Sequence, residues 1–249
     1  MKIDFSGQVV LVTGATRGIG KQIAEDFAAL GARLILTGTK QGPVDRHPES
    51  GPAEKGRSDF YCVDFTDEDS TGRFIEALAQ YERIDVCVNN AGINRVNYVD
   101  EARVEDWDDI LAVNLKAPFL ITRAVSPVMK RNGYGRIINI SSVYGIISRE
   151  KRSIYSASKF GLRGLTVAVS NELARHNILV NAVSPGFVLT DLTRGILSEE
   201  EMTALAAQIP AGRLAVPSDV SRVVLFLASA LNTYITGQNI IVDGGYVNV

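Results

Sequence analysis

The chain passes from an unbroken apolar stretch, Val9-Val10-Leu11-Val12, directly into a glycine-rich turn, Thr13-Gly14-Ala15-Thr16-Arg17-Gly18-Ile19-Gly20. Such an apolar run is typical of a strand that is covered on both faces. Apolar residues then recur at helical spacing from Ile19 to Leu30, and Gly31 ends the helix. Glycines in a strand-to-helix turn let the backbone approach a pyrophosphate at the helix N-terminus. The spacing differs from the commoner G-x-G-x-x-G, so a purely structural turn is the alternative interpretation of this stretch alone.

Strands and helices alternate along the rest of the chain. This pattern predicts an α/β fold: a single-domain Rossmann fold over residues 1–249, with a doubly wound parallel sheet of about seven strands and helices on both faces. Pro118 is expected to kink the longest helix. The further strands are predicted at residues 33–37, 59–63, 86–89, 136–140, 179–183 and 239–242, and the further helices around 74–79 and at 104–130, 154–176 and 220–228.

One segment breaks the alternation where a helix is due. Residues 41–56 contain three prolines and three glycines, so a full helix is improbable there. We expect an irregular, mobile loop beside the adenosine end of a bound dinucleotide.

Composition excludes several classes of protein. The 249 residues include 22% charged and 46% hydrophobic residues, which are ordinary values for a globular domain. The net charge of −2 offers no general attraction to nucleic acid or to an anionic membrane. The sequence has neither an apolar run long enough to span a membrane nor a signal-peptide core at its start.

The few cysteines and histidines argue against a metal site. Cys62 and Cys87 each lie in an apolar strand-like run, which predicts two buried, reduced thiols in a cytoplasmic protein. His47 and His176 are far apart and have no ligand partner at metal-binding spacing. We therefore expect no metal.

Tyr155 and Lys159 lie four residues apart in a predicted helix, so their side chains share one face. A phenol has a pKa of about 10, and a nearby ammonium group lowers it by favouring the phenolate. Such a pair can move a proton to or from a carbonyl or alcohol oxygen at neutral pH. The alternative is a partly buried tyrosine beside a solvated lysine.

The end of the second predicted strand indicates which dinucleotide is bound. An acidic residue at this place would grip a free ribose 2′-hydroxyl, but the sequence reads Thr37-Gly38-Thr39-Lys40. Arg17 and Lys40 can instead attract a 2′-phosphate. NADP(H) is therefore favoured, while NAD(H) stays possible because Asp45 in the irregular loop borders the same pocket.

Together these residues resemble the short-chain dehydrogenase/reductase family over nearly the whole chain. The family's Thr-Gly-x-x-x-Gly-x-Gly motif stands at 13–20, its Asn-Asn-Ala-Gly motif at 89–92 and its Tyr-x-x-x-Lys motif at 155–159. Its Pro-Gly motif stands at 185–186, and a closing Asp-Gly-Gly stands at 243–245. The resemblance implies an NAD(P)(H)-dependent enzyme that interconverts a ketone and a secondary alcohol by hydride transfer.

The resemblance also implies the roles of individual residues. The catalytic set is Asn114, Ser142, Tyr155 and Lys159. Tyr155 is the acid/base, Ser142 positions the substrate oxygen, Lys159 lowers the pKa of Tyr155 and holds the nicotinamide ribose, and Asn114 anchors a proton-relay water. The cofactor-binding set is Thr13, Gly14, Thr16, Arg17, Gly18, Ile19, Gly20, Thr39, Asp64, Asn90, Ala91, Gly92, Tyr155, Lys159, Pro185, Gly186, Val188 and Thr190.

Several of these residues have a simpler interpretation. Asp64 can cap the next helix instead of binding adenine, Asn89 and Asn114 can be structural hydrogen-bonding residues, and Pro185-Gly186 can be only a turn.

Substrate contacts are expected from loops over the site. The predicted substrate-binding residues are Ser142, Tyr144, Arg149, Tyr155 and Phe187. A substrate lid is predicted at about 189–213, with an apolar face formed by Ile196, Leu197, Met202, Leu205 and Ile209. The charged run from Arg149 to Arg152 is read either as substrate-binding or as a solvated loop.

The C-terminal half most resembles the 3-oxoacyl-[acyl-carrier-protein] reductases. Lys130, Arg131 and Arg175 are candidate contacts for an acidic carrier protein near the site mouth, although Asn171 stands where that subgroup often has a basic residue. The alternative is a polyol or sugar-acid dehydrogenase, because Arg149 can pair with a carboxylate. A cofactor-binding sensor without catalysis is a third hypothesis. The family also implies a homo-oligomer, a tetramer or a dimer, formed through the helices at 104–130 and 154–176.

Overall fold

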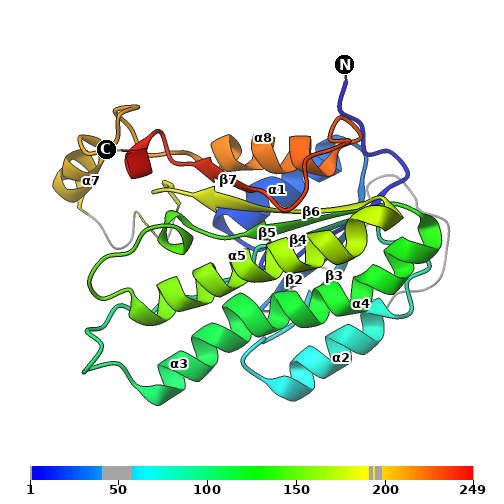
Figure 1. Ribbon diagram of the computed structural model, residues 1–249, viewed down its shortest axis with the longest axis horizontal. Coiled ribbons are helices and arrows are strands. Elements are labelled where there is room, and N and C mark those ends of the chain that lie inside the picture. Colours follow the sequence, from blue (N-terminus) through cyan, green and yellow to red (C-terminus); the bar gives the residue numbers. More distant parts are fainter. Residues whose placement is uncertain (1, 41–57, 191–192, 194–197, 249) are drawn as a thin grey trace.

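The computed structural model describes residues 2–40, 58–190, 193 and 198–248. Seven strands form one parallel sheet in the order β3-β2-β1-β4-β5-β6-β7 (Figure 1). This confirms the predicted doubly wound sheet. The strands are β1 Val9–Val12, β2 Arg33–Gly38, β3 Ser58–Cys62, β4 Val86–Asn89, β5 Gly135–Ile140, β6 Ile178–Pro185 and β7 Asn239–Val242.

Helices cover both faces of the sheet, as predicted. Figure 1 shows α1 and α8 on one face and α2, α4 and α5 on the other, with α3 leading into α4. The helices are α1 Gly18–Ala29, α2 Glu68–Leu78, α3 Val104–Leu111, α4 Ala117–Asn132, α5 Ser153–Leu173, α7 Glu199–Ala206 and α8 Pro217–Ala228. Short 3₁₀ turns lie at Val143–Gly145, Ala174–His176 and Tyr246–Asn248.

The two-residue period of a strand divides the core between the faces. Val10 and Val12 of β1 pack on the side of α1, whereas Val9 and Leu11 pack on the opposite side. Because all four side chains are buried, β1 is apolar throughout. The order of the strands reverses at β1, whose neighbours are β2 and β4, so the carboxyl ends of β1 and β4 border the crevice where such sheets bind ligands.

The longest predicted helix is continuous but changes its winding. Residues Ala112–Lys116 between α3 and α4 form a π-helical turn, closed by a hydrogen bond from Ala117 N to Ala112 O. Pro118 follows immediately and has no N–H to donate, so the irregularity lies just before the predicted kink.

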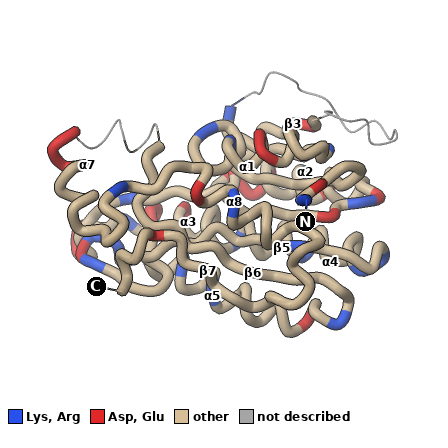
Figure 2. Tube along the Cα trace, turned by 90° about the horizontal axis from the view of Figure 1, so that it is seen from above, with Lys and Arg blue, Asp and Glu red and all other residues tan. Residues whose placement is uncertain are grey.

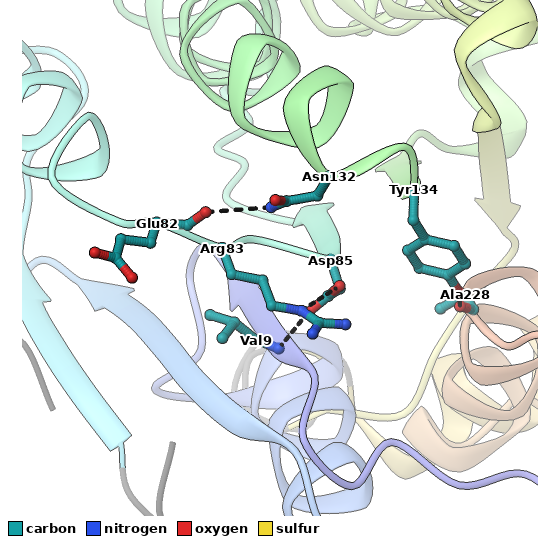
Figure 3. A network of polar contacts seen from close by, with 7 residues as sticks. All are labelled: Val9, Glu82, Arg83, Asp85, Asn132, Tyr134 and Ala228. Atoms are coloured by element: carbon teal, nitrogen blue, oxygen red, sulfur yellow. Dashed lines mark hydrogen bonds and ion pairs between the residues drawn. The ribbon is translucent and has the colours of Figure 1, made fainter. Parts of the chain in front are cut away.

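Figure 3 shows polar contacts near the amino ends of β1 and β4. Arg83 Nε donates to both carboxylate oxygens of Asp85 at 2.8 Å, and Asp85 Oδ2 also accepts from Val9 N at 2.8 Å. Asn132 Nδ2 donates to Glu82 O at 3.2 Å. These contacts join β1, β4 and the end of α4. They lie at the amino ends of the strands, opposite the ligand crevice at the carboxyl ends.

Cys62 departs from the prediction of two buried thiols. Both cysteines are free, and Cys87 is buried in the centre of the sheet, but Cys62 is exposed. Cys62 is the last residue of β3, and β3 is an edge strand among the strands that the structure describes. The apolar pattern of the segment could not reveal this edge position.

Charges of both signs are scattered over the parts of the chain coloured in Figure 2. Among the described residues, no helix is both long and apolar enough to cross a membrane. The predicted loop at 41–56, which includes Asp45 and His47, lies outside the described residues, as do residues 191–192 and 194–197 of the predicted lid.

Candidate active site

The glycine-rich turn is tightly packed against the end of β4. Gly14 has φ +65°, and a Cβ there would lie 2.9 Å from Ala91 Cα. A Cβ at Gly20 would overlap Asn90 Nδ2 and the Gly14 carbonyl oxygen. Glycine is therefore required at both positions, the first for its conformation and the second for space.

Thr13 and Asn90 lock the turn to β4. Thr13 Oγ1 accepts from Asn90 N at 2.9 Å and from Ala91 N at 3.0 Å. Asn90 Nδ2 donates to Thr13 O at 2.9 Å and to Gly14 O at 3.0 Å. The Asn90 side chain therefore shapes the crevice through the turn.

The N-terminus of α1 is open to a ligand. Its N-cap residue, Arg17, makes no side-chain capping hydrogen bond. Three exposed residues lie near this N-terminus: Thr16, Arg17 and Thr39. Thr190 approaches the N-terminus from the other side of the site, because its Cγ2 atom would lie 3.3 Å from a Cβ built on Gly18. An open helix N-terminus beneath a tight glycine turn fits a dinucleotide pyrophosphate.

Asp64 does not cap the next helix. Its carboxylate Oδ1 accepts from Thr66 N at 2.9 Å and from Thr66 Oγ1 at 2.7 Å. The N-cap of α2 is Asp67, which accepts from Asp69 N and Ser70 N. The simpler interpretation of Asp64 as a cap is therefore wrong, and its exposed side chain stands at the end of β3.

The Pro-Gly turn after β6 is closely supported. A Cβ on Gly186 would lie 2.8 Å from Asp243 Cβ, and Gly186 N donates to Val242 O at 2.9 Å. Val188, two residues on, is buried and forms a parallel bridge with Ala215. The turn thus fixes the backbone that leads to Thr190.

Asn114 lies in the π-helical turn and is fully buried. Its Oδ1 accepts from Ile93 N at 2.9 Å, while its Nδ2 donates to Ile93 O at 2.9 Å and to Ser158 Oγ at 3.1 Å. The amide thus ties the loop after β4 to α5. A Cβ built on Gly92 would lie 3.5 Å from Asn114 Oδ1 and 3.6 Å from Lys159 Nζ, so these groups converge on one point.

Ser142, Tyr155 and Lys159 meet beside the carboxyl end of β5. Ser142 begins the turn after β5, and its Oγ accepts from Tyr144 N at 3.1 Å. Lys159 is buried, and its Nζ donates to Ile140 O at 2.8 Å. Lys159 Nζ also lies 5.7 Å from the centre of the Tyr155 ring. The structure therefore brings the four predicted catalytic residues together from three segments.

Burial dominates the electrostatics of Tyr155. It raises the pKa of Tyr155, while the hydrogen bond with Ser142 and the charge of Arg152 act in the opposite direction. Burial lowers the pKa of Lys159 to about 8. Lys159 Nζ donates to Ile140 O at 2.8 Å, and the lowering of the Tyr155 pKa by Lys159 stays a prediction.

Aromatic rings line the next part of the site. Tyr144 lies 6.4 Å from Tyr155 and 6.4 Å from Phe187, measured between ring centres. Tyr246, near the end of the chain, packs edge-on against Phe187 at 5.0 Å. Tyr246 was missed in the sequence, since nothing in the local pattern shows that the chain returns to this place.

Two arginines flank Tyr144. Arg149 is exposed, with its guanidinium carbon 5.8 Å from the centre of the Tyr144 ring. Arg152 lies at 5.6 Å and is partly buried. The charged run is therefore neither wholly solvated nor wholly part of the site. Arg152 was not among the predicted site residues. Its position three residues before Tyr155 could have indicated that it lies near the site.

The candidate carrier-protein contacts lie elsewhere within one chain. Lys130 and Arg131 end α4, and Arg175 follows α5, just before β5 and β6 begin. Tyr155 lies at the opposite end of α5, about 30 Å away for a helix of this length. Within one chain these three residues lie at the end of the sheet away from Tyr155, because each helix runs antiparallel to its strands, and their contact with a carrier protein stays a prediction.

Comparison with known proteins agrees with the geometry. A family model described as enoyl-(acyl carrier protein) reductase matches residues 14–247. The chain belongs to the short-chain dehydrogenase/reductase family. It is 42% identical to the 3-oxoacyl-[acyl-carrier-protein] reductase FabG of Thermotoga maritima, covering 98% of this chain and 99% of the relative. Identity to the Escherichia coli FabG is 39%, with 98% of both chains covered.

Solved structures of the family have the same fold. A protein of Beutenbergia cavernae, provisionally named an NAD(P)-dependent gluconate 5-dehydrogenase and containing NADP at low occupancy, superposes with a TM-score of 0.88. It is 31% identical, with 99% of each chain covered. ElxO with NADP bound has a TM-score of 0.87 at 29% identity, covering 98% of this chain and 100% of ElxO. The protein is thus an oxidoreductase of this family.

Proposed function

We propose that the protein reduces 3-oxoacyl thioesters to 3-hydroxyacyl thioesters with NADPH. The observation that carries the chemistry is the convergence of Ser142, Tyr155, Lys159 and Asn114 beside a dinucleotide crevice. The choice of substrate is supported by the FabG relatives.

The residues around the crevice fit NADP(H). The turn from Gly14 to Gly20 and the open N-terminus of α1 would hold the pyrophosphate. Arg17, Thr39 and Lys40 would surround the 2′-phosphate, where the end of β2 has no carboxylate. The remaining contacts would come from Thr13, Thr16, Asp64, Asn90, Ala91 and Gly92 on the adenosine side, and from Pro185, Gly186, Val188 and Thr190 on the nicotinamide side.

The reaction needs a hydride and a proton on opposite ends of the substrate C=O bond. The reduced nicotinamide supplies the hydride to the carbonyl carbon when it is bound. The Tyr155 hydroxyl gives its proton to the carbonyl oxygen, and Ser142 donates a hydrogen bond that holds this oxygen in place. Lys159 stabilises the resulting phenolate and returns a proton to it, with Asn114 as the predicted anchor of a relay water.

The segment at 189–213 is proposed to close over the substrate. Its described part contains α7, which begins with a capping box between Ser198 and Glu201. Buried Ile209 and a hydrogen bond from Ala211 N to Gly244 O at 3.0 Å fix the C-terminal end of this segment. Leu189 N donates to Ala215 O at 2.8 Å at the start of the segment, so a short helix between two held ends would cover the site.

A polyol or sugar-acid dehydrogenase is the second candidate. It is favoured by the two arginines beside Tyr144 and by the likeness to the Beutenbergia cavernae protein. An intact set of Asn114, Ser142, Tyr155 and Lys159 argues against a cofactor-binding sensor without catalysis.

The test follows NADPH consumption with an acetoacetyl thioester, with NADH as the control. Turnover that prefers NADPH supports the proposal and the 2′-phosphate contacts together. Cofactor binding without turnover, followed by activity on sugar acids or polyols, would replace it with the second candidate.

The protein is also proposed to be a cytoplasmic homo-oligomer. The outer faces of α4 and α5 expose Phe119 (47%), Phe160 (44%) and Val167 (44%), which is unfavourable unless another copy of the chain covers them. Free cysteines, one of them exposed, suit a reducing compartment.

A further inference from the structure

Arg152 places buried hydrogen-bond donors beside the acid/base residue. Among the residues that the structure describes, its Nε and Nη1 atoms are buried and have no hydrogen-bond partner. The Tyr144 hydroxyl is also buried, and Arg152 interacts with it and opposes the rise in its pKa that burial causes. The guanidinium lies over the Tyr144 ring at 5.6 Å, and the Tyr144 ring lies 6.4 Å from that of Tyr155.

Buried polar atoms in folded proteins nearly always have partners, and donors left alone are costly. The contact with the Tyr144 ring compensates part of the charge of Arg152, but it gives Nε and Nη1 no acceptor. Two buried guanidinium nitrogens without an acceptor, next to a buried phenol, therefore indicate an acceptor that arrives with a ligand.

The position of this corner shows which ligand it is. Tyr155 and Ser142 are joined by a hydrogen bond and are the groups that handle the reacting oxygen. Tyr144 follows Ser142 in the turn after β5, and Arg152 precedes α5, so both flank this pair. A second oxygen on the same substrate would reach Arg152 and Tyr144 while the ketone oxygen contacts Tyr155.

We infer that Arg152 and Tyr144 bind a second substrate oxygen, carried by an acyl group near the reacting ketone. This inference rests on the ketone reduction proposed above and extends it to a specificity-determining pair. The acyl oxygen is the thioester carbonyl of a 3-oxoacyl thioester or the carboxylate of an oxo acid. Both accept from a guanidinium and from a phenol hydroxyl.

The experiment compares the full-length wild type with Arg152→Gln, using NADPH and three ketones. Acetoacetyl-N-acetylcysteamine carries a thioester carbonyl, acetoacetate carries a carboxylate, and 2-pentanone carries no second oxygen. We expect kcat/KM to fall about 10- to 100-fold on whichever acyl substrate the wild type prefers. The fall on 2-pentanone and the change in the Kd for NADPH should stay below about threefold.

Three variants separate the pair from its surroundings. Lys151→Gln removes a neighbouring charge that contacts Tyr98 instead of Tyr144, so it should behave as wild type. Tyr144→Phe should lose part of the same activity. The double variant Arg152→Gln with Tyr144→Phe should lose less than the product of the two single losses, because both groups bind one oxygen.

The outcomes distinguish this inference from the proposed function. Turnover of acetoacetate but not of the thioester, with loss in Arg152→Gln, removes the thioester reductase and keeps the arginine site. An Arg152→Gln enzyme within twofold of wild type on both acyl substrates overturns the inference. The same holds if Arg149→Gln alone causes the loss, or if the wild type reduces neither acyl substrate.

Discussion

The protonation of Tyr155 is decided by its surroundings. Burial raises its pKa, and this influence exceeds the opposing ones from Ser142 and Arg152. The phenol is therefore protonated at neutral pH, which is the form that a reductase needs. Oxidation of the alcohol needs the phenolate, so the reverse reaction should gain rate as the pH rises.

Tyr155→Phe should reduce turnover by about 10²- to 10⁴-fold, because it removes the proton donor without changing the shape of the ring. The Kd for NADPH should change little, as followed by cofactor fluorescence. Tyr234→Phe is the matched control, since Tyr234 is 95% exposed. Retention of most activity in Tyr155→Phe would contradict the mechanism.

Lys159 should make the stability of the protein depend on pH. Its pKa falls from the ordinary 10.5 to about 8 on folding. Between these values the unfolded chain holds more protons, so the unfolding free energy rises with pH. Lys159→Met should be more stable than wild type at pH 7 by up to about 3 kcal/mol, and the gap should close by about pH 11, above the pKa of the unfolded lysine. Denaturant melts at both pH values test this, and a gap independent of pH would contradict it.

Thr39→Asp should shift cofactor preference from NADPH toward NADH by at least about tenfold, through repulsion of the 2′-phosphate. Thr39 is exposed at the end of β2, whereas Gly38 is unsuitable for this test because a Cβ there would overlap Thr16 Cγ2. Thr39→Asn, of similar size but uncharged, is the control. The ratio of kcat/KM for the two cofactors is the measurement, and equal ratios in both variants would place the phosphate elsewhere.

At the scale of elements, the start of α5 is held against the turn Val143–Gly145. A Cβ on Gly145 would lie 2.7 Å from Ser141 Oγ and 2.9 Å from Lys159 O. Gly145→Ala should push α5 away from β5, lowering kcat about 10-fold or more and stability by about 1–3 kcal/mol.

Gly72→Ala in α2 provides the control. No atom outside the local backbone lies within 4 Å of a Cβ built on Gly72, so the helix should gain about 0.5–1 kcal/mol. Both variants can be measured by thermal melts and turnover. Full activity in Gly145→Ala would show that α5 tolerates displacement.

Elements with strong local patterns were predictable. The strands Val86–Asn89 and Asn239–Val242 begin and end at the predicted residues, because apolar β-branched runs mark them clearly. Strand order carries no such local signal, so the edge position of Cys62 was missed. The place of Lys130 and Arg175 within one chain could be predicted, since the length and direction of a crossover helix already put its end at the opposite end of the strands from Tyr155.

The site residues with a local sequence motif were predictable, and those placed by contacts between distant segments were not. The glycine turn and the residues around Tyr155 share short motifs, and the structure gathers them in one place. The burial of Arg152 depends on how its side chain packs on the Tyr144 ring. The place of Tyr246 depends on packing against Phe187 and near Tyr144, which lie far before it in the chain. No local pattern encodes such contacts.

At the scale of the whole molecule, the apolar faces of α4 and α5 predict assembly. Phe160→Asp should convert the oligomer to smaller species or monomers, because a buried carboxylate without a partner is strongly unfavourable. Light scattering after gel filtration gives the mass. Tyr234→Asp, at an aromatic residue 95% exposed, should leave the mass unchanged. A wild type that is monomeric at micromolar concentration would contradict the proposal.

The catalytic residues come from the π-helical turn, the end of β5 and the start of α5, and they assemble against a crevice between β1 and β4. Parallel neighbours are joined by long crossover connections, so contacts between these segments must close loops over long sequence separations. A collapsed intermediate with native helices would contain the helix of Tyr155 and Lys159. It would still lack the cofactor crevice, which needs the paired strands β1 and β4. During refolding, the regain of NADPH oxidation should therefore follow the regain of helical circular dichroism, which makes enzymatic activity a late reporter of sheet completion.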